Sequence, residues 1–463
     1  MSIYATGCVK LKIFGGHLML EVKTSKLPTL PLKTIWMLSF GYVGVQMAFS
    51  LQSSNMGRIF ETLGADPTRL GFFFILPPLA GIFVQPIVGK FSDKTWAPRI
   101  GGRRLPYLLI SSLVAMIVLA LLPNSGSFGF SIPVALWFGA TAILFMDLSS
   151  NIAMQPFKMI VGDMVNEKQK GYAYSIQSLF SNTGAVLASI FPFVLTAIGI
   201  HNTAPSGQIP KSVIVSFYAG AAILIICSLI TVFKVKEYPP EEYAAYHTLT
   251  KEEQFEKISI FKLLARAPRI FWTITVVQFF CWMGFQYLWT YGTGAISQNI
   301  WGIVDPASAK YQAAGNWFGM MSAVQAVSAV IWSYVLAKIP DNRQKGAYAL
   351  SLLLGGIGFI SFFFIHIQIM LVFSFALIGI SWAAMMSFPF IFLTNGIESA
   401  GEGAHMGTFL GLFNGSICFP QIVASIASFV LFPLFGSSHI LMILLSGFLL
   451  IIGASNVFLI KDI

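Results

Sequence analysis

One carboxylate is set apart from the other acidic residues of this sequence. Asp147 falls in the middle of a long apolar run, whereas the rest of the 18 acidic residues are predicted in loops or at the ends of such runs. An ionisable group at the centre of a bilayer costs at least about 2.5 kcal/mol, so it normally faces a cavity and has a function. Because burial generally raises the pKa of a carboxyl group, such a group can bind and release a proton near neutral pH. We therefore predict reversible protonation of Asp147; the alternative is a buried bond that only stabilises the fold.

The run around Asp147 has a defined polar face if it is helical. At 100° per residue, Asn151, Met154 and Lys158 share a face with Asp147. Lys158 would lie about 16 Å away along the helix axis, which is too far for an ion pair. We expect Lys158 to mark the mouth of the polar face instead.

Amide and indole side chains inside other apolar runs suggest a binding pocket. A sugar offers hydroxyl groups to amides and an apolar C–H face to flat rings, and a pocket for it needs both. Each amide alone is equally explained by an interhelical hydrogen bond, so the prediction rests on the set. The candidates are Gln46, Gln52, Asn55, Asn151, Gln177, Gln278, Trp282, Gln286, Trp289, Asn316, Gln325, Asn414 and Gln421. Trp332 and Trp382 are predicted to be packing aromatics.

These side chains must be positioned by helices that cross a membrane. Of 463 residues, 56% are hydrophobic and 10% charged, whereas soluble domains carry about 25% charged residues. This composition excludes an ordinary soluble enzyme, a disordered chain and a secreted disulfide scaffold. The long unbroken apolar runs also differ from the alternating segments, about 10 residues long, of a transmembrane β-barrel.

Apolar runs of about 20 residues each predict twelve spans, and therefore an all-α integral membrane protein. The predicted spans are 34–57, 69–89, 105–122, 133–157, 172–198, 213–233, 271–297, 315–337, 347–366, 369–394, 406–432 and 439–460. The predicted organisation is an N-terminal segment 1–33, a six-helix half 34–234, a linker 235–269 and a second six-helix half 270–463. Met19 is an alternative start, and translation from it would leave out residues 1–18; no signal peptide is predicted.

The cations are sorted along the chain, which carries a net charge of +10. The loops on one side of the predicted spans contain four of the 28 Lys and Arg residues: Arg58, Arg69, Lys211 and Lys310. The termini, the linker and the loops on the other side contain the remaining 24. The positive-inside rule predicts that both termini and the linker are cytoplasmic. The positive charge therefore reports topology, and we expect no nucleic-acid partner.

Nothing in the sequence favours catalysis, because it has no phosphate-binding loop, HExxH motif or metal-type cluster of Cys and His. We expect no enzyme, no metal and no cofactor. Gly407, Gly411 and Gly415 form a GxxxGxxxG stripe, which we predict to permit close helix contact.

Four segments carry a family resemblance. After the second span, Gly89-Lys-Phe-Ser-Asp93 precedes Gly101-Gly-Arg-Arg104; the other three segments are Gly44-Val-Gln46, Gln155-Pro156 with Lys158 and Asp163, and Asn414 with Pro420-Gln421. Together they resemble the major facilitator superfamily, in particular its sucrose–proton symporter branch, which is related to the glycoside–pentoside–hexuronide symporters. Plant members carry an arginine at Lys158, an acidic pair in the seventh span and one more arginine near Arg103. These departures argue against plant-type sucrose specificity and favour a bacterial relative that handles maltose or another glucoside; the resemblance as a whole predicts a bacterial carrier of the maltose or sucrose type.

The resemblance implies functions for two groups of residues. It makes Asp147 the proton-coupling site. It makes Asp93, Arg103 and Arg104, joined by Lys158 and Asp163, a charge latch that closes the cytoplasmic side; the alternative is a plain charged turn. The predicted function is proton-coupled symport of a glycoside or disaccharide by alternating access, with sodium coupling not excluded. The alternatives are an uncoupled facilitator, a carrier of another small organic solute, or a membrane sugar sensor. We expect a monomer in the cell (inner) membrane.

Overall fold

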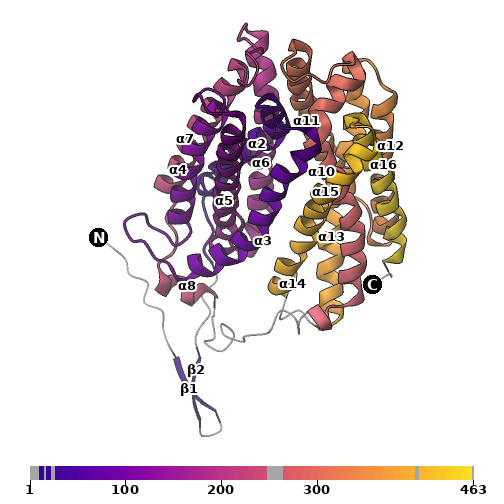
Figure 1. The fold of residues 1–463 in the computed structure, drawn as a ribbon. Helices are drawn as coiled ribbons and strands as arrows, with labels where there is room; N and C mark the ends of the chain where they lie inside the picture. The colour runs from indigo at the N-terminus through magenta and orange to yellow at the C-terminus, as the bar shows by residue number, and fades with distance from the viewer. Residues whose placement is uncertain (1–9, 15–16, 22–26, 248–263, 402–405, 461–463) are drawn as a thin grey trace.

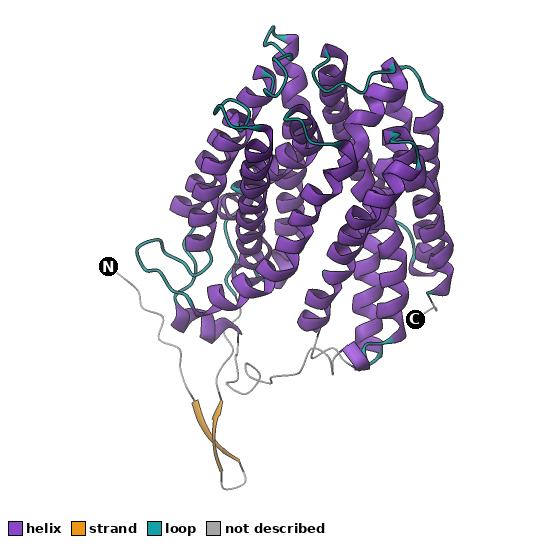
Figure 2. Ribbon diagram, viewed as in Figure 1, coloured by secondary structure: helices purple, strands orange, loops and turns teal. Residues whose placement is uncertain are grey.

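The computed structural model describes residues 10–14, 17–21, 27–247, 264–401 and 406–460. Nearly all of this part of the chain is helical (Figures 1 and 2). The two strands of the described chain form a hairpin, in which β1 (Lys10–Phe14) pairs antiparallel with β2 (His17–Glu21). The hairpin lies apart from the helices in Figure 2.

The first half of the molecule contains seven long helices. They are α1 (Leu32–Phe40), α2 (Tyr42–Thr62), α3 (Leu70–Lys94), α4 (Leu105–Leu121), α5 (Ile132–Met164), α6 (Glu167–Ala197) and α7 (Lys211–Lys234). Short 3-10 turns at Pro67–Arg69 and Leu122–Asn124 precede α3 and follow α4. Helices α1 and α2 form one span with Gly41 between them. The Gly41 N–H donates to Thr231 Oγ1 of α7 over 2.8 Å, and a Cβ there would lie 2.9 Å from the Phe157 ring.

The second half follows a linker that contains α8 (Pro240–His247). Its helices are α10 (Arg269–Trp301), α11 (Ala309–Leu336), α12 (Asp341–Phe364), α13 (Leu371–Ser399), α14 (Met406–Phe413), α15 (Gly415–Leu434) and α16 (His439–Asn456). Short 3-10 turns at Gln368–Met370 and Val457–Leu459 precede α13 and follow α16. Helices α14 and α15 form one span interrupted at Asn414.

Ten helical segments of the described chain are long and apolar enough to cross a membrane. Two more helices complete the predicted twelve. One is α3, whose apolar stretch covers Pro67–Ile82, and the other is α10, which is 33 residues long. Helix α10 is the less apolar of the two because it carries Gln278, Gln286, Thr290 and Thr293, all buried. The all-α class and the twelve-helix fold are thus confirmed.

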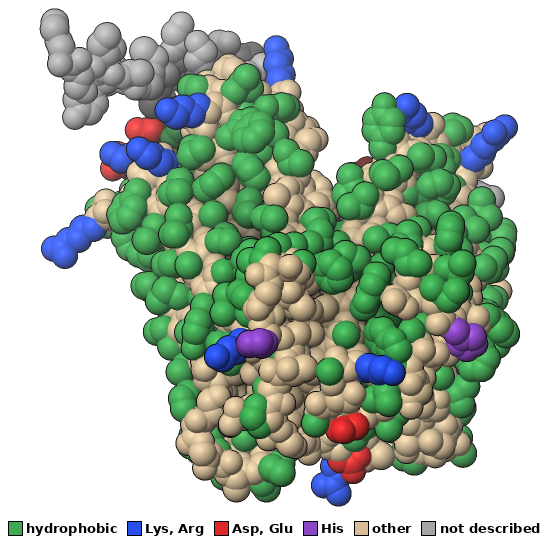
Figure 3. All heavy atoms as spheres, turned by 90° about the horizontal axis from the view of Figure 1, so that it is seen from above, with side chains coloured by type: hydrophobic (Ala, Val, Ile, Leu, Met, Phe, Trp, Pro, Cys, Tyr) green, Lys and Arg blue, Asp and Glu red, His purple; other side chains and the backbone are tan. Residues whose placement is uncertain are grey.

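The most extensive packing between the two halves is that of α6 with α11, α3 with α15 and α2 with α10, and α2 also contacts α11. We call the end of the molecule that bears α8 the linker end, and the other the opposite end. In Figure 1 the ribbons of the two halves approach towards the opposite end and diverge towards α8 and α14. Seen from the opposite end, hydrophobic side chains dominate the flanks, and charged side chains are few and scattered (Figure 3).

Glycines permit the closest approaches between the halves. A Cβ at Gly71 of α3 would lie 2.3 Å from the Ser425 carbonyl oxygen of α15, and a Cβ at Gly319 of α11 would lie 2.3 Å from the Ser189 carbonyl oxygen of α6. Side chains do not fit at such distances, so these positions require glycine for the two halves to meet as they do.

Candidate functional site

Asp147 lies in α5 with its side chain buried, 1% exposed. Its Oδ2 accepts a hydrogen bond of 2.9 Å from Nε2 of Gln52 on α2. Within the described side chains, no Lys, Arg or His forms an ion pair with it. The carboxylate is therefore held by a neutral amide from a neighbouring helix, and the Gln52 oxygen is itself buried without a hydrogen-bond partner among the described residues.

The other candidates of the first half differ in what they bind. Asn151 donates to the Asp147 carbonyl and Asn55 to the Leu51 carbonyl, both within their own helices. Gln177 of α6 donates to the Phe157 carbonyl of α5 over 2.5 Å, which is an interhelical bond. Gln46 is half-buried on α2. The structure therefore joins Gln52 to Asp147 and assigns Gln177 to packing.

An aromatic cluster lies in the second half. The Trp282 ring of α10 is 6.2 Å from that of Trp289 and 5.6 Å from that of Trp382 on α13, and Phe285 lies within the same cluster. The Trp282 indole N–H is buried without a hydrogen-bond partner in the described chain. Trp382 packs against these rings, which agrees with the packing function predicted for it; that it packs on Trp282 was not predicted, because no sequence pattern shows which face of α13 meets α10.

The aromatic cluster and Asp147 lie at a similar depth. The two halves touch where a Cβ on Gly57 of α2 would lie 2.9 Å from the Thr290 carbonyl oxygen of α10. Both helices run from the linker end to the opposite end. With a rise of 1.5 Å per residue, Gln52 lies about 7.5 Å from this contact towards the linker end, and Trp289 and Trp282 lie about 1.5 and 12 Å from it. The Gln52–Asp147 pair thus lies level with the middle of the cluster.

The remaining candidates of the second half fall into three groups. Gln278 and Gln286 donate to carbonyl groups, of Met385 on α13 and of Phe74 on α3, and the second bond joins the two halves. Asn414 donates weakly to the Gly81 carbonyl over 3.5 Å. The structure gives the amide groups of Gln325, which is buried, and Gln421, which is half-buried, no hydrogen bond with a described residue.

Asn316 belongs to a polar cluster that the sequence analysis missed. Arg58 was predicted to lie in the loop after the first span, but α2 continues to Thr62 and the Arg58 side chain is 1% exposed. Its guanidinium donates to Gln312 (2.7 Å) and Asn316 (2.9 Å) of α11, and to Asn202 (2.7 Å) in the loop after α6. Helix continuation was readable from the apolar residues Ile59, Phe60 and Leu63 that flank the charges, but the partners on α11 were not.

Further bonds complete this polar cluster at the opposite end. Gln312 Nε2 donates to Thr62 Oγ1 (2.9 Å), and Asn316 Nδ2 donates to Thr196 Oγ1 of α6 (2.8 Å), so both amides bridge the halves. Glu61 of α2 is also buried, with Oε1 3.6 Å from Nε2 of His439 at the start of α16. The opposite end of the molecule is closed by these contacts.

The predicted latch lies at the linker end. Asp163 Oδ2 pairs with Arg103 (3.0 Å) and with Arg104 (3.2 Å), which also donates to Ser92. These partners come from α3, from the loop that leads into α4, and from α5 of the first half. The side chains of Asp93 and Lys158, two predicted members of the latch, lie outside the described residues.

The linker packs onto this network. Tyr243 of α8 donates to Asp163 Oδ1 (3.2 Å), and the Arg103 guanidinium lies 3.5 Å from the centre of its ring. Glu237 Oε1 accepts from the N–H groups of Arg104 and Leu105, so it caps the start of α4. Burial raises the pKa of the Glu237 carboxyl group, and the backbone hydrogen bonds oppose that shift. The described bonds of the latch therefore join the first half to the linker.

The GxxxGxxxG prediction of close helix contact is wrong for two of its three glycines. A Cβ at Gly411 or Gly415 would meet no atom within 4 Å; the surroundings of Gly407 lie outside the described residues. The spacing of the glycines permits close contact but does not supply a helix opposite them, and here the halves diverge at that level.

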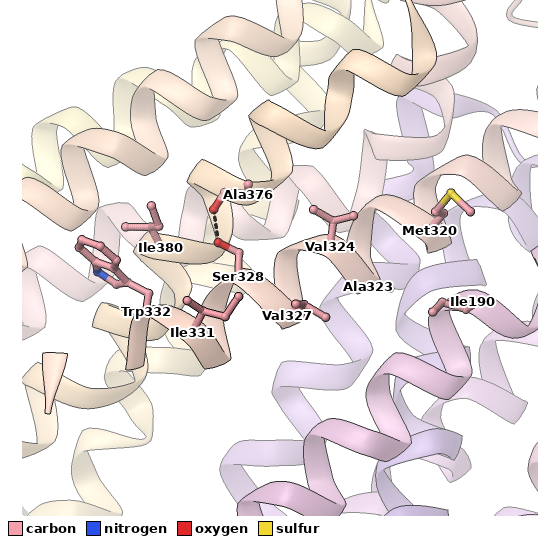
Figure 4. A pocket seen from close by; sticks show the side chains of 10 residues that line it. All are labelled: Ile190, Met320, Ala323, Val324, Val327, Ser328, Ile331, Trp332, Ala376 and Ile380. Atoms are coloured by element: carbon pink, nitrogen blue, oxygen red, sulfur yellow. Dashed lines mark hydrogen bonds between the residues drawn. The ribbon is translucent and has the colours of Figure 1, made fainter. Parts of the chain in front are cut away.

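One cavity of about 510 Å³ lies away from all these polar groups. Figure 4 shows it lined by apolar side chains of α11 and α13, with Ile190 from α6. Its Ser328 hydroxyl is already bonded to the Ala376 carbonyl over 2.6 Å. Trp332 lines it as well and donates to Ser351 Oγ (3.0 Å), which fits the packing function predicted for this residue. A sugar would find no free polar partner there, so this cavity is not the candidate site.

The comparison with family models decides the identity. The model described as Major Facilitator Superfamily matches residues 38–425. The chain belongs to this superfamily. The resemblance predicted from sequence motifs is thus confirmed, and superfamily members related to this chain are transporters rather than enzymes.

Curated superfamily relatives include sucrose transport proteins of plants. SUC4 of Arabidopsis thaliana is 24% identical over 86% of this chain and 83% of its own length. SUT1 and SUT2 of Oryza sativa subsp. japonica are 23% and 25% identical over 91% and 92% of this chain, covering 86% and 92% of their own lengths.

Solved structures share the fold. The nucleoside transporter NupG aligns with a TM-score of 0.67 and 14% identity over 92% of this chain and 98% of its own. A bacterial homologue of the human lysosomal transporter Spinster, in an inward-facing and occupied conformation, aligns with a TM-score of 0.62 and 13% identity over 93% of this chain and 96% of its own.

Proposed function

We propose that this protein is a secondary transporter that moves a glycoside or disaccharide together with a proton. The observation that supports it most is the depth shared by two groups on different halves. Asp147 and Gln52 lie on the first half, and the cluster around Trp282 and Trp289 lies on the second. A proton site and a platform for a sugar ring thus lie level with each other, on the linker side of the contact between the halves.

Each group has chemistry suited to one part of the cargo. An indole ring packs on the apolar C–H face of a sugar, while amides such as Gln278 and Gln46 hydrogen-bond its hydroxyl groups. The Gln278 oxygen and the Trp282 N–H are buried without a hydrogen-bond partner in the described chain, so both remain free to accept or donate. The names of the plant sucrose transport proteins agree with a sugar as the cargo.

Asp147 would couple this cargo to a proton. A charge buried without a counter-ion is costly, and binding of a proton removes it. Gln52 can donate to the carboxylate and accept from the protonated acid, because its amide carries both an N–H and an oxygen. Rotation of the two halves about the central site would then expose Asp147 and the sugar to one side at a time.

The charge bias orients this cycle. Applied to the fold, the positive-inside rule makes the linker end cytoplasmic, with both termini on that side of the cell membrane. The structure, closed at the opposite end by Arg58 and its partners, would then be open to the cytoplasm. Arg58 lies in α2 rather than in a loop, so three of the four cations remain assigned to the outer loops. The excess of positive charge is still at the linker end.

Three alternative functions would use some of the same residues. An uncoupled facilitator would use the aromatic cluster but not Asp147, a sodium-coupled carrier would use Asp147 as a ligand, and a sugar sensor would bind without transport. Through Tyr243, helix α8 of the linker contacts Asp163 and Arg103 of the latch. A linker that packs onto the latch favours a transporter over a sensor that signals through its linker.

The test is uptake by purified monomeric protein in liposomes, with a panel of glycosides and an imposed gradient of protons or of sodium. We expect accumulation of one glycoside class with an inward proton gradient and none with sodium alone. Trp282→Phe should weaken sugar binding about tenfold or more, because stacking and the indole N–H are both altered. Uptake indifferent to both gradients would overturn proton coupling, and binding without uptake would favour the sensor.

A further inference from the structure

The polar cluster at the opposite end contains a carboxylate that forms no hydrogen bond with a described side chain in the closed conformation. Glu61 is 2% exposed, and both of its oxygens are buried without a hydrogen-bond partner in the described chain. On the other half, Nε2 of His439 lies 3.6 Å from Glu61 Oε1, which is beyond hydrogen-bond distance. A buried carboxylate without hydrogen bonds is costly to keep, so its presence requires a reason beyond packing.

Arg58 lies one helical turn before Glu61 on α2. Residues three apart on a helix are neighbours, and oppositely charged side chains at this spacing can pair. In the closed conformation the Arg58 guanidinium is directed instead to the amide oxygens of Gln312 and Asn316 on the other half, with Asn202 as a third acceptor. No ion pair between Arg58 and Glu61 forms among the described side chains.

Separation of the halves at the opposite end would remove several of these contacts together. Gln312 and Asn316 leave with α11, and His439 leaves with α16. Arg58 and Glu61 stay together, because both belong to α2. Without a new partner, the guanidinium would lose two charge-assisted hydrogen bonds.

We infer that Arg58 and Glu61 form a two-position switch in the gate at the opposite end. In the closed state Arg58 bonds to the amides of α11. In the open state it bonds to Glu61, which stabilises the conformation in which the other half has moved away. Glu61 is then the acceptor of the open state, which explains why it is buried but unbonded in the closed one. Both are positioning residues, because neither touches the cargo.

The switch also explains the glycine of α11 that lies against the Arg58 side chain. A Cβ at Gly315 of α11 would lie 2.5 Å from Cδ of Arg58. Glycine at this position lets α11 approach the arginine side chain closely enough for both neighbouring amides, Gln312 and Asn316, to reach the guanidinium. The closed position of the switch is thus built from α11 as well as from α2.

The inference predicts opposite effects for two substitutions. Asn316→Ala removes an acceptor of the closed state and should raise the open-to-closed ratio about tenfold, as expected for one hydrogen bond to a charged group. Glu61→Gln keeps an acceptor oxygen but removes the charge that favours Glu61 as the partner of Arg58 in the open state, so it should lower the same ratio severalfold. Asn299→Ala is the matched control, because Asn299 bonds to the Phe362 and Ile365 carbonyls within the second half.

The experiment measures the distance between spin labels at Ser206, in the loop after α6, and Lys310, at the start of α11; both positions are exposed and lie at the opposite end. The four native cysteines are first replaced by alanine, and the protein is studied in lipid nanodiscs without substrate. Shifts of opposite sign for Asn316→Ala and Glu61→Gln, with none for Asn299→Ala, support the switch. An unchanged ratio in Glu61→Gln, or a shift in the same direction as Asn316→Ala, overturns it.

The switch rests on the proposed function only in that both need the halves to move. Since the distances are measured without transport, the two can fail separately. Uptake driven by protons, with no response of the ratio to Glu61→Gln, removes the switch alone. Opposite shifts in a protein that accumulates no sugar remove the proposed cargo or its coupling and leave the switch intact.

Discussion

The two ends of the molecule use their buried arginines in different ways. At the opposite end, Arg58 hydrogen-bonds to α11 and thereby joins the first half to the second. At the linker end, the described bonds of Arg103 and Arg104 run to Asp163 and Glu237, within the first half and the linker. One set of bonds can only form when the halves are together. The other can persist while they move, because its members belong to one body.

The glycines of the two ends differ in the same sense. Gly71 and Gly319 are in close contact with the other half, whereas a side chain at Gly411 would meet nothing. An alternating-access transporter must be able to close either end, so the contrast describes one conformation of a cycle. Substitutions at each end should therefore affect opposite states.

The largest expected effect is at a tight glycine of the opposite end. Gly319→Leu places a side chain where the Ser189 carbonyl lies 2.3 Å from the Cβ. Overpacking of this kind costs about 1–3 kcal/mol, so the closed-to-open ratio at the opposite end should fall by roughly ten- to a hundredfold, and uptake with it. The distance between labels at Ser206 and Lys310 measures the ratio. A ratio like that of the wild type would show that this contact does not limit closure.

A smaller effect is expected at the latch. Asp163→Asn replaces the charged acceptor of Arg103 and Arg104 with a neutral amide oxygen, which should cost about 1 kcal/mol of stability and lower the midpoint of thermal unfolding. Since these bonds do not cross to α11, the label distance at the opposite end should stay as in the wild type. A changed distance with unchanged stability would mean that the latch joins the halves after all.

The smallest effect is expected at the glycine stripe near the linker end. Gly411 lies on the face of its span that carries Asn414, which approaches Gly81 of α3. Gly411→Leu should leave unfolding unchanged, because the position is open. It should hinder closure of the linker end and so lower uptake a fewfold while sugar binding persists. Gly346→Leu, at another open position, serves as the control. Full uptake in Gly411→Leu would show that this face stays open throughout the cycle.

Much of the fold could be predicted because hydropathy is a local property. The predicted spans 105–122 and 213–233 lie within about two residues of α4 and α7. The first predicted span ended too early, at residue 57. The prediction ended this helix before the charged residue Arg58. In the structure the Arg58 side chain is buried and hydrogen-bonded to amides some 250 residues further along the chain, at Gln312 and Asn316.

The candidate site was predictable in part for the same reason. Asp147 stood out because its charge is isolated in its own helix, and the structure supplies Gln52 as its partner. Trp382 could not be assigned to the cluster of Trp282 and Trp289, since the rotation of α13 against α10 depends on packing across the whole half. The partners of Gln177 and Gln286 depend in the same way on which helices become neighbours.

The measurement that tests the central claim most directly compares two modes of transport in liposomes for wild type and Asp147→Asn. One mode is uphill uptake of the sugar driven by an inward proton gradient, and the other is exchange of labelled for unlabelled sugar without a gradient. We expect Asp147→Asn to lose uphill uptake by about a hundredfold or more while exchange continues, because the amide binds no proton but still fits beside Gln52. Uphill uptake equal to that of the wild type would contradict the assignment of Asp147 as the proton-coupling residue.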